Sequence, residues 1–159
     1  MASVLPFDKI DTIDIARFWV WVEKTDSCWE WVGRTTKLGY GVANTSDGKR
    51  LAHRMSWYIK HGSISDLAID HACHNPACVN PDHLRMATAK QNAENLLPVR
   101  ASSGYRGVYA AGRKWQAEVT HNGVSHRIGK FESPEAAHEA VVAMRNKLFT
   151  HNNADRLAA

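Results

Sequence analysis

Apolar side chains recur at helical spacing near the start of the chain. Within residues 10–23, the apolar positions that fall on one helical face are Ile15, Phe18, Trp19 and Val22. Spacings of three and four residues predict an amphipathic helix that packs on the segment after it. The run Trp19-Val20-Trp21-Val22 also fits a strand, so the two alternatives stay open at this point.

The next stretch alternates with a period of two and is interrupted by turn-forming residues. Short strands are predicted at 28–32, 40–43 and 49–52, and a helix is predicted at 53–60. Turns or ends are expected where glycine interrupts the pattern, at Gly33, Asp47-Gly48 and Gly62. A short apolar run, 67–69, leads into a polar segment, and Thr88 is the expected N-cap of a helix through Leu97.

A polar linker, residues 98–104, separates this half from a second pattern. Three strand-like runs follow it, at 107–109, 115–121 and 125–131. Asn122-Gly123 is the hairpin signal between the last two. Ser133-Pro134-Glu135 then opens a helix with an N-cap serine, proline in the first helical position and an acid in the first turn. The small apolar face of this helix suits close packing on a three-stranded sheet.

The order of these elements predicts an α+β protein with two small domains. The expected divisions are a helical extension, a first domain, a linker, a second domain and a tail, at 1–24, 25–97, 98–103, 104–150 and 151–159. Neither half has much apolar core of its own. Small domains often obtain the missing stability from a bound zinc ion, and the first half is the one expected to need it.

Positive charge is concentrated in the second half. Residues 1–96 carry 11 basic and 11 acidic side chains, whereas residues 97–159 carry 9 basic and 5 acidic ones. Such a surplus of positive charge favours binding to a polyanion, most commonly nucleic acid. The alternative is a basic face that is merely solvated. No apolar run approaches the roughly 20 residues that span a bilayer, and no secretory signal is evident. We therefore expect a cytoplasmic protein with no membrane partner.

Candidate metal ligands are concentrated in residues 70–92. Three of them follow one another at intervals of five residues: Cys73, Cys78 and His83. Soft ligands at this spacing suit a tetrahedral zinc ion, and Cys28 would complete a closed structural Cys₃His site. His71 and His74 are rival fourth ligands. The three cysteines cannot all pair in one chain, and a role as small buried residues is the alternative to metal binding.

A second metal ion is suggested by the polar side chains that zinc leaves unused, namely Asp70, His71 and Asn92. A carboxylate and an amide oxygen suit magnesium, which keeps several waters and binds substrate phosphate. A neutral His71 could take a proton from water and so make the nucleophile that attacks phosphorus. Arg54 could brace the growing negative charge. Taken singly, His71 and Asn92 also fit ordinary solvated or capping roles.

A family resemblance connects these residues. It rests on Cys28-Trp29-Glu30-Trp31, on Ala52-His53-Arg54, on the segment from His71 to Leu84, and on Thr88 with Asn92. On these matches, residues 28–97 resemble the HNH endonucleases, in particular the zinc-stapled subset that overlaps the His-Cys box homing endonucleases. The resemblance implies a ββα-metal nuclease domain.

The same resemblance implies a role for each matching side chain. His71 would be the general base and Asn92 the magnesium ligand. Zinc would be held by Cys28, Cys73, Cys78 and His83. Asp70 matches the acidic metal ligand of many HNH enzymes, on which the His-Cys box group does not depend, and Arg54 is a suggested phosphate clamp.

A second resemblance covers residues 103–149. It rests on the stretches 105–108, 115–119, 128–131 and 134–137. These resemble the plant ethylene-response-factor (AP-two) DNA-binding domain, whose sheet enters the major groove while the helix packs behind it. The resemblance implies DNA contacts from Arg106, Arg113, Lys114, Trp115, Thr120 and Arg127. Trp115 also fits a core position. Tyr109 and Arg127 depart from the plant pattern, so plant target preference is not transferred.

Together the patterns predict a site-specific, magnesium-dependent DNA endonuclease of the homing type, encoded by a phage or mobile element and acting on double-stranded DNA in the host cell. The first domain would hydrolyse the phosphodiester and the second would choose the site; a homodimer stays open. The alternatives are a non-enzymatic DNA-binding regulator with a structural zinc, and a repair or packaging nuclease without sequence preference. Retention of His71 and Asn92 favours the enzyme, since an inactive site needs neither.

Overall fold

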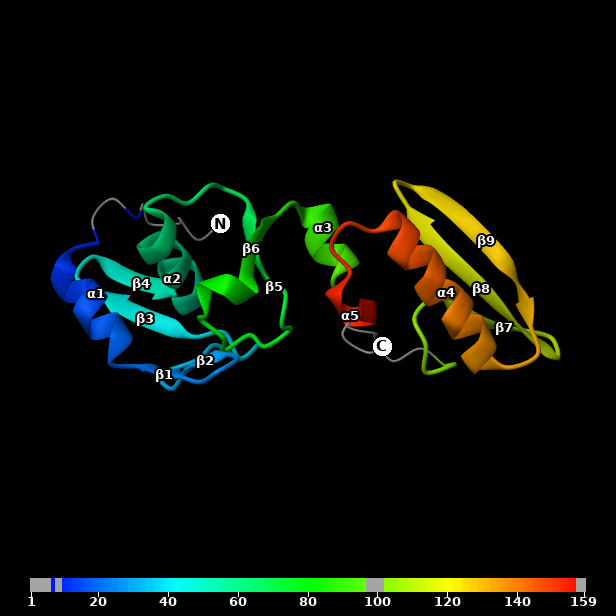
Figure 1. The fold of residues 1–159 in the computed structure, drawn as a ribbon, viewed down its shortest axis with the longest axis horizontal. Coiled ribbons are helices and arrows are strands. Elements are labelled where there is room, and N and C mark those ends of the chain that lie inside the picture. Colours follow the sequence, from blue (N-terminus) through cyan, green and yellow to red (C-terminus); the bar gives the residue numbers. More distant parts are fainter. Residues whose placement is uncertain (1–6, 8–9, 97–101, 157–159) are drawn as a thin grey trace. The chain divides into compact units, whose positions relative to one another are not determined.

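The computed structural model describes residue 7, residues 10–96 and residues 102–156. Its elements are a mixture of short helices and small antiparallel sheets (Figure 1). Contacts divide the chain into two compact units, residues 1–89 and residues 90–159. We refer to them as unit 1 and unit 2. None of the described helices is both long enough and apolar enough to cross a membrane.

Unit 1 consists of three two-stranded ribbons and two longer helices. The elements, in chain order, are α1 (Thr12–Trp19), β1 (Val22–Lys24), β2 (Trp29–Trp31), β3 (Val42–Thr45), β4 (Gly48–Leu51), α2 (Ala52–His61), β5 (Ala68–His71), the 3₁₀ turn η2 (Pro81–His83) and β6 (Leu84–Ala87). The antiparallel ribbons are β1–β2, β3–β4 and β5–β6. The predicted helix is confirmed for the part that ends at Trp19, whereas Val20 and Trp21 form a turn and strand β1 begins only at Val22.

A side-chain cap begins α1, and a glycine ends α2. Asp11 at the N-cap of α1 accepts a hydrogen bond from the Asp14 backbone N–H at 2.7 Å. The buried carboxylate of Asp14 accepts the Ser46 backbone N–H and hydroxyl at 3.0 and 2.9 Å, which ties α1 to the β3–β4 turn. Helix α2 ends as expected at Gly62, whose φ of 71° lies in the left-handed region that glycine adopts without cost.

Aromatic and small residues form the core of unit 1. Its fully buried members are Phe7, Phe18, Trp31, Ala43, Ala52, Met55 and Val79. Trp31 lies directly on the backbone that leads into β3, because a Cβ placed at Gly41 would approach the indole to 2.6 Å. Only glycine at position 41 leaves room for the indole at this distance. The core is small, as the composition of this half predicts.

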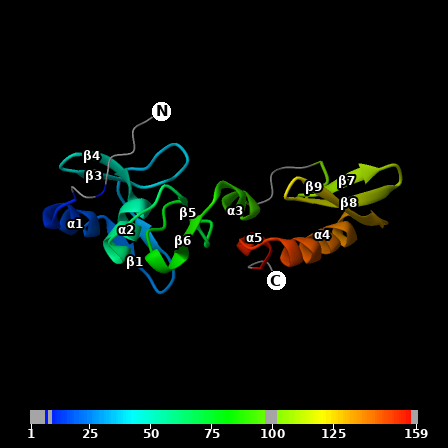
Figure 2. The same ribbon diagram turned by 90° about the horizontal axis from the view of Figure 1, so that it is seen from above.

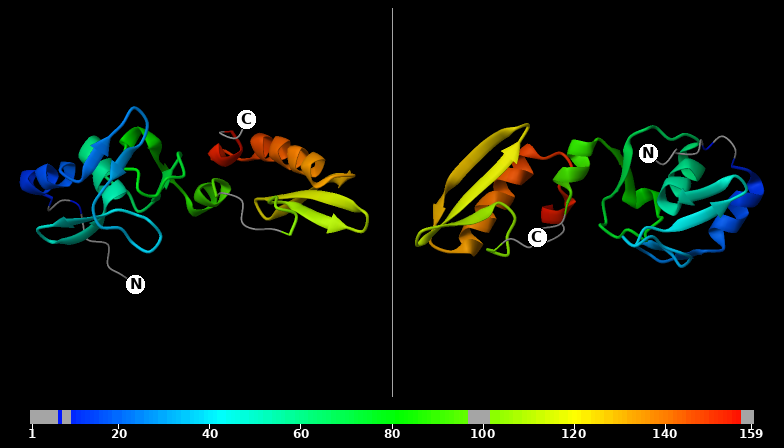
Figure 3. Two further views of the ribbon diagram at one scale, coloured as in Figure 1. Left: turned by 90° about the horizontal axis from the view of Figure 1, so that it is seen from below. Right: turned by 180° about the vertical axis from the view of Figure 1, so that it is seen from behind.

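Unit 2 is a three-stranded antiparallel sheet covered on one face by a long helix. Its elements after α3 (Ala89–Glu94) are β7 (Val108–Ala111), β8 (Lys114–His121), β9 (Val124–Phe131), α4 (Pro134–Leu148) and α5 (Asn153–Arg156), with strand order β7-β8-β9. Figures 2 and 3 show α4 lying along one side of the sheet. The hairpin at Asn122-Gly123 has positive φ at both residues, 52° and 76°, and the Ser133 hydroxyl caps α4 at the Ala136 N–H. All three strands and the helix confirm the predicted pattern.

Helix α3 ends earlier than expected and is fastened to unit 2. The Glu94 carboxylate accepts the backbone N–H of Thr150 at 2.9 Å, and the Asn95 amide oxygen accepts that of Asn153 at 3.0 Å. The Arg106 guanidinium donates to the carbonyls at 93 and 96. These bonds explain why the division between units falls at the start of α3, ahead of the predicted linker 98–103; residues 98–101 of that linker, and Leu97, lie outside the described residues.

Candidate metal centre and active site

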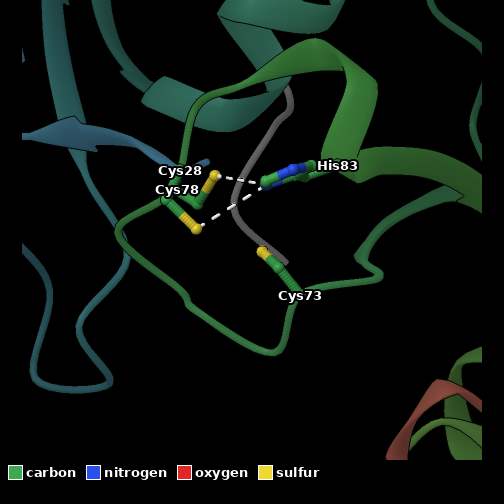
Figure 4. Close-up of side chains that lie close together, drawn as sticks. All are labelled: Cys28, Cys73, Cys78 and His83. Carbon is green, nitrogen blue, oxygen red and sulfur yellow. Dashed lines mark hydrogen bonds between the residues drawn. The ribbon is translucent and has the colours of Figure 1, made fainter. Parts of the chain in front are cut away.

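Four side chains that can bind a metal ion converge in unit 1. The sulfurs of Cys28, Cys73 and Cys78 and a ring nitrogen of His83 all lie within 4.8 Å of one another (Figure 4). His83 Nδ1 is 3.6 Å from both Cys28 Sγ and Cys78 Sγ. The rival fourth ligands, His71 and His74, are not members of this group. The structure thus brings together the Cys₃His set that the sequence suggested.

The β5–β6 ribbon and strand β2 position these four side chains. Pairing of His71 with Leu84 closes the base of the loop 72–83, which carries three of the donors. Within that base, the Ala72 N–H donates to the His83 carbonyl at 2.9 Å. Further along, the loop runs beside β2, where Val79 N–H donates to the Trp29 carbonyl at 2.8 Å. Cys78 is thereby placed next to Cys28, although the two are fifty residues apart in sequence.

Asn80 stabilises the bend that turns the loop back toward β6. Its amide nitrogen donates to the Ser27 carbonyl at 2.9 Å, and its amide oxygen accepts the Asp82 N–H at 3.0 Å. Its backbone N–H points to Cys78 Sγ at 3.4 Å. A peptide N–H that donates to sulfur favours the thiolate, the form in which cysteine binds metal. Asn80 therefore shapes the Asn-Pro turn and supports the sulfur beside it.

The crowded sulfurs share protons unequally. A hydrogen bond from the Cys78 thiol lowers the pKa of Cys73 to about 5. Cys78 is correspondingly the proton donor, and that role raises its pKa above the ordinary value. A divalent cation at the centre of the group would replace these protons and stabilise all the sulfurs as thiolates. Three thiols and an imidazole fit zinc, which forms closed tetrahedral sites with this donor set.

His71, the candidate base, is the last residue of β5 and is buried beside this loop. Its Nε2 lies 3.0 Å from the Cys78 carbonyl oxygen. Because a carbonyl can only accept, Nε2 carries the proton and the neutral ring has its lone pair on Nδ1. Burial lowers the pKa of His71, although the hydrogen bond to Cys78 acts in the opposite direction. A neutral imidazole with a fixed tautomer is the form that can accept a proton.

Two further rings pack on His71. His53, from the start of α2, crosses it edge-to-face with ring centroids 4.8 Å apart, and Tyr40 lies 5.8 Å away. Burial first, and then the neighbouring His71, lower the pKa of His53 to about 3. The sequence reasoning gave His53 no role. Its signal was present, because Ala52-His53-Arg54 is one of the stretches that carry the family resemblance.

Asp70 forms an ion pair with a residue of the neighbouring strand. It stands opposite Arg85 in the β5–β6 ribbon, and the Arg85 Nε and Nη2 lie 2.9 and 2.8 Å from its Oδ2. Adjacent residues of a strand point to opposite faces, so Asp70 and His71 diverge from one another. The structure therefore shows an Asp70–Arg85 ion pair, and a role for Asp70 in binding magnesium stays a prediction.

Arg54 and Asn92 are not placed at the phosphate by any described contact. The Arg54 guanidinium donates to the carbonyls of Leu67 and Ser65 at 3.2 and 3.4 Å, which braces the segment leading into β5. Asn92 lies on α3, which is grouped with unit 2. The roles of both residues at the cleaved phosphate stay predictions.

Some of the predicted DNA-contacting side chains of unit 2 are packed or hydrogen-bonded within the unit, whereas others are exposed. Trp115 packs against the core on the side of α4, which is the second of its two predicted alternatives. The Arg106 guanidinium donates to the Leu96 carbonyl, just after α3. Thr120 and Arg127 are exposed, and alternation along β8 places Thr120 on the face opposite the buried Val119. Arg113 is exposed in the β7–β8 turn, and exposed Lys114 pairs with Glu132.

Comparison with known proteins identifies the middle of the chain. Residues 50–94 match the family model described as HNH endonuclease. This stretch is therefore similar to the HNH endonuclease domain. It contains His71, Asn92 and three of the four metal-binding candidates, whereas Cys28 precedes it. The match supports a nuclease function for the chain.

Relatives of the HNH domain come from viruses. The chain is 34% identical over 85 residues to Protein 2.8 of Escherichia phage T7, covering 52% of this chain and 58% of the relative. It is 32% identical over 115 residues to an Acanthamoeba polyphaga mimivirus protein named as an uncharacterized HNH endonuclease, L560, covering 71% and 60%. Protein 7.7 of phage T7 is 27% identical over 100 residues, covering 62% and 72%. The chain spans about three fifths of the length of the first two. No solved structure gives a significant match.

Replacing one sulfur should release the metal ion and destabilise unit 1. We expect Cys73→Ser to lose the stoichiometric metal of the purified wild-type chain and to lower the free energy of unfolding of unit 1 by several kcal/mol, since structural zinc binding is itself folding energy. Elemental analysis and thermal melting check this. Ala77→Ser, which adds a hydroxyl to the same loop but removes no ligand, is the control. Unchanged metal content and melting in Cys73→Ser would show that the sulfurs hold no ion.

The buried His53 should make unit 1 sensitive to acid. The pKa of His53 is about 3 in the folded state, against an ordinary value of 6.5. Between pH 3 and pH 6.5 this imidazole therefore binds a proton in the unfolded chain but not in the folded chain. Stability is unaffected above pH 6.5 and falls below it, by at most about 1.4 kcal/mol per pH unit. Urea unfolding of the wild type and of His53→Gln from pH 5.5 to 7.5 should show a shallower slope in the variant. Metal release at low pH contributes to the loss of stability in the wild type and in the variant alike. Equal slopes in the two proteins would therefore contradict the role of His53.

Proposed function

We propose that this chain is a site-specific, magnesium-dependent DNA endonuclease of the homing type, which hydrolyses phosphodiester bonds to leave 5′-phosphate and 3′-hydroxyl ends. The observation that carries the proposal is the position of His71 within the HNH domain. Its Nε2 is tied to the carbonyl of Cys78, which is itself a member of the Cys₃His group. The loop that gathers the metal ligands thus also fixes the tautomer of the base.

Zinc is proposed for the Cys₃His group, in a structural role. The donors are soft and four in number, Cys78 is buried while the other three are partly buried, and the Asn80 N–H supports one sulfur. A closed site of this kind has no position left for substrate, so the ion would stabilise unit 1 without entering the reaction. Its contribution to chemistry would be indirect, through the shape of the loop 72–83.

His71 is proposed as the general base. Its Nδ1 lone pair would accept a proton from the attacking water as that oxygen bonds to phosphorus. The packed rings of His53 and Tyr40 restrict the orientation of the imidazole. Both neighbours lie in unit 1, so the direction of the base is set by the core of that unit.

Magnesium is proposed as the catalytic ion. Asn92 is the ligand that the HNH resemblance implies, and Asp70 matches the acidic ligand of many HNH enzymes. A bound ion would polarise the scissile phosphate and stabilise the departing 3′ oxygen. Asp70 already neutralises Arg85, which makes Asn92 the stronger of the two assignments. Arg54 would have to exchange its two carbonyl contacts for a phosphate, so the structure favours a supporting role for it in the segment before β5.

Unit 2 is proposed to select the DNA site through the face of its sheet that α4 leaves open, as in the AP-two resemblance. That face and its adjoining turn offer Arg113, Lys114, Thr120 and Arg127. The Arg127 side chain is 81% exposed, with one long contact of 3.6 Å to Glu118. An exposed guanidinium can read guanine in the major groove by a bidentate contact. Trp115 and Arg106 would support the sheet and α3 rather than read bases.

The viral relatives support an enzyme that belongs to a phage or a mobile element and acts on double-stranded DNA in the host cytoplasm. Cutting both strands with one kind of centre calls for two such centres at the site. A homodimer on a two-fold related target is the simplest way to supply them.

Removing the imidazole of His71 should abolish cleavage while DNA affinity stays near normal. Loss of a general base lowers the rate by about 10²- to 10⁴-fold, and the change leaves the DNA contacts proposed for unit 2 in place. The measurement is single-turnover cleavage of a randomised duplex library with magnesium, followed by sequencing of the cut ends. His61→Ala, an exposed histidine of the same unit, is the control. Cleavage by His71→Ala at the wild-type rate would exclude it as the base.

Removing one exposed arginine of the sheet should relax site choice. We expect Arg127→Ala to reduce discrimination at one base position by about 1–3 kcal/mol, the value of a bidentate base contact. Sequencing of ends cut from the same library measures the base preference at each position. Lys147→Ala removes an exposed charge from α4, on the other side of the sheet, and should leave the preference unchanged. An unaltered preference in Arg127→Ala would place the selection of the site elsewhere.

A further inference from the structure

A groove in unit 1 lies apart from the residues assigned to catalysis and metal binding. Its volume is about 390 Å³, and it is bounded by α1, the turn after α1, the loop after β2, and β3. In Figure 1, α1 lies beside β3 and β4. This volume falls within the range of sites for small organic groups, roughly 300–1,000 Å³. The groove is therefore large enough for a nucleobase with its sugar.

The floor and one rim of the groove are aromatic. Phe18 and Trp31 are buried at the bottom, with ring centroids 5.3 Å apart. Trp21 stands at the rim with 51% of its surface exposed. The backbone of Trp21 is fixed on both sides, because its N–H donates to Phe18 and its carbonyl accepts from Val32, at 3.1 and 2.9 Å. An exposed indole on a fixed backbone is a flat surface held ready for stacking.

Two arginines border the same groove. Arg17 and Arg34 both line it and are both exposed, and neither guanidinium pairs with a carboxylate or carbonyl among the described residues. The carbonyl of Arg34 accepts the Trp31 indole N–H and the Val42 N–H at 3.0 and 2.8 Å, which holds its backbone at the rim. No carboxylate of the described residues lines the groove. Its charge therefore suits an anion that also has a flat ring.

We propose that this groove binds an unpaired nucleotide of single-stranded DNA, with the base stacked on Trp21 and the flanking phosphates held by Arg17 and Arg34. Aromatic platforms beside a cationic groove bind single strands because each base has a face for stacking and each nucleotide has a phosphate. A base inside a duplex has its faces covered by its neighbours, so stacking on Trp21 selects unpaired DNA. This site is additional to the duplex contacts proposed for unit 2.

The test measures binding of a fluorescein-labelled 12-nucleotide thymidine strand, and of a labelled 12-base-pair duplex, by anisotropy on the full metal-loaded chain without magnesium. Trp21→Ala should weaken single-strand binding by about 5- to 150-fold, corresponding to ~1–3 kcal/mol per stacked base. Trp21→Tyr, which keeps an aromatic face, should retain most of the affinity. Duplex binding should change little in both variants. The Tyr variant also separates loss of stacking from any loss of folding.

The arginines are tested by salt dependence. Arg17→Ala with Arg34→Ala should reduce the slope of log K against log salt for the single strand by about 1.4, or ~0.7 for each phosphate that the variant no longer neutralises. The matched control is Lys37→Ala with Lys49→Ala, two exposed lysines of unit 1 that do not line the groove. It should leave the slope unchanged.

Three results would overturn the proposal. The first is unaltered single-strand binding by Trp21→Ala, and the second is an equal effect of the arginine and lysine pairs. The third is an equal weakening of duplex and single-strand binding by Trp21→Ala. Because no cleavage is measured, these outcomes are independent of whether His71→Ala abolishes the proposed nuclease activity.

Discussion

The convergence of three sulfurs and one imidazole within 4.8 Å is the constraint on which the first half of the molecule depends. The loop 72–83 contains no regular strand or helix except the short turn η2, and its backbone groups are satisfied by β2, by Asn80 and by the ends of β5 and β6. Unit 1 has a small core made largely of aromatic and small residues. A core of this size gains much from an ion that ties β2 to a loop fifty residues away.

The same constraint connects structure to chemistry through one carbonyl group. Cys78 contributes its sulfur to the Cys₃His group and its carbonyl to His71 Nε2. A change in the position of that residue would therefore alter both the metal site and the tautomer of the proposed base. Residues that fix this segment from behind, such as Ser56, whose hydroxyl donates to the Val79 carbonyl at 2.5 Å, belong to the same support.

The local elements and the ligand set could be predicted because their signals are local. Asn122-Gly123 specifies a hairpin by its backbone preferences, and Ser133-Pro134 specifies a helix start. Cys73, Cys78 and His83 follow one another at a compact spacing that suits zinc ligands. The choice of Cys28 as the fourth donor needed either the family resemblance or the structure, because nothing local to Cys28 points to the loop. These signals predicted the last hairpin and the long helix of unit 2 and three of the four ligands of unit 1, whereas β1 and β6 of unit 1 were not predicted.

Other features depend on contacts that no spacing reveals. Arg85 pairs with Asp70 only because the register of β5 and β6 places them opposite one another. Helix α3 belongs to unit 2 because Glu94 and Asn95 accept backbone N–H groups from the segment after α4, more than fifty residues later. His53, near the start of α2, packs against His71 at the end of β5, although the two are eighteen residues apart in sequence. Trp115 fitted two environments equally well until the face occupied by α4 was known.

The most direct test of the central claim is the coordination of the metal in the purified wild-type chain, measured by X-ray absorption at the zinc edge together with elemental analysis. The account predicts one zinc per chain with three sulfur ligands at about 2.3 Å and one nitrogen at about 2.0 Å. A substoichiometric ion, or an ion surrounded only by oxygen and nitrogen, would contradict it.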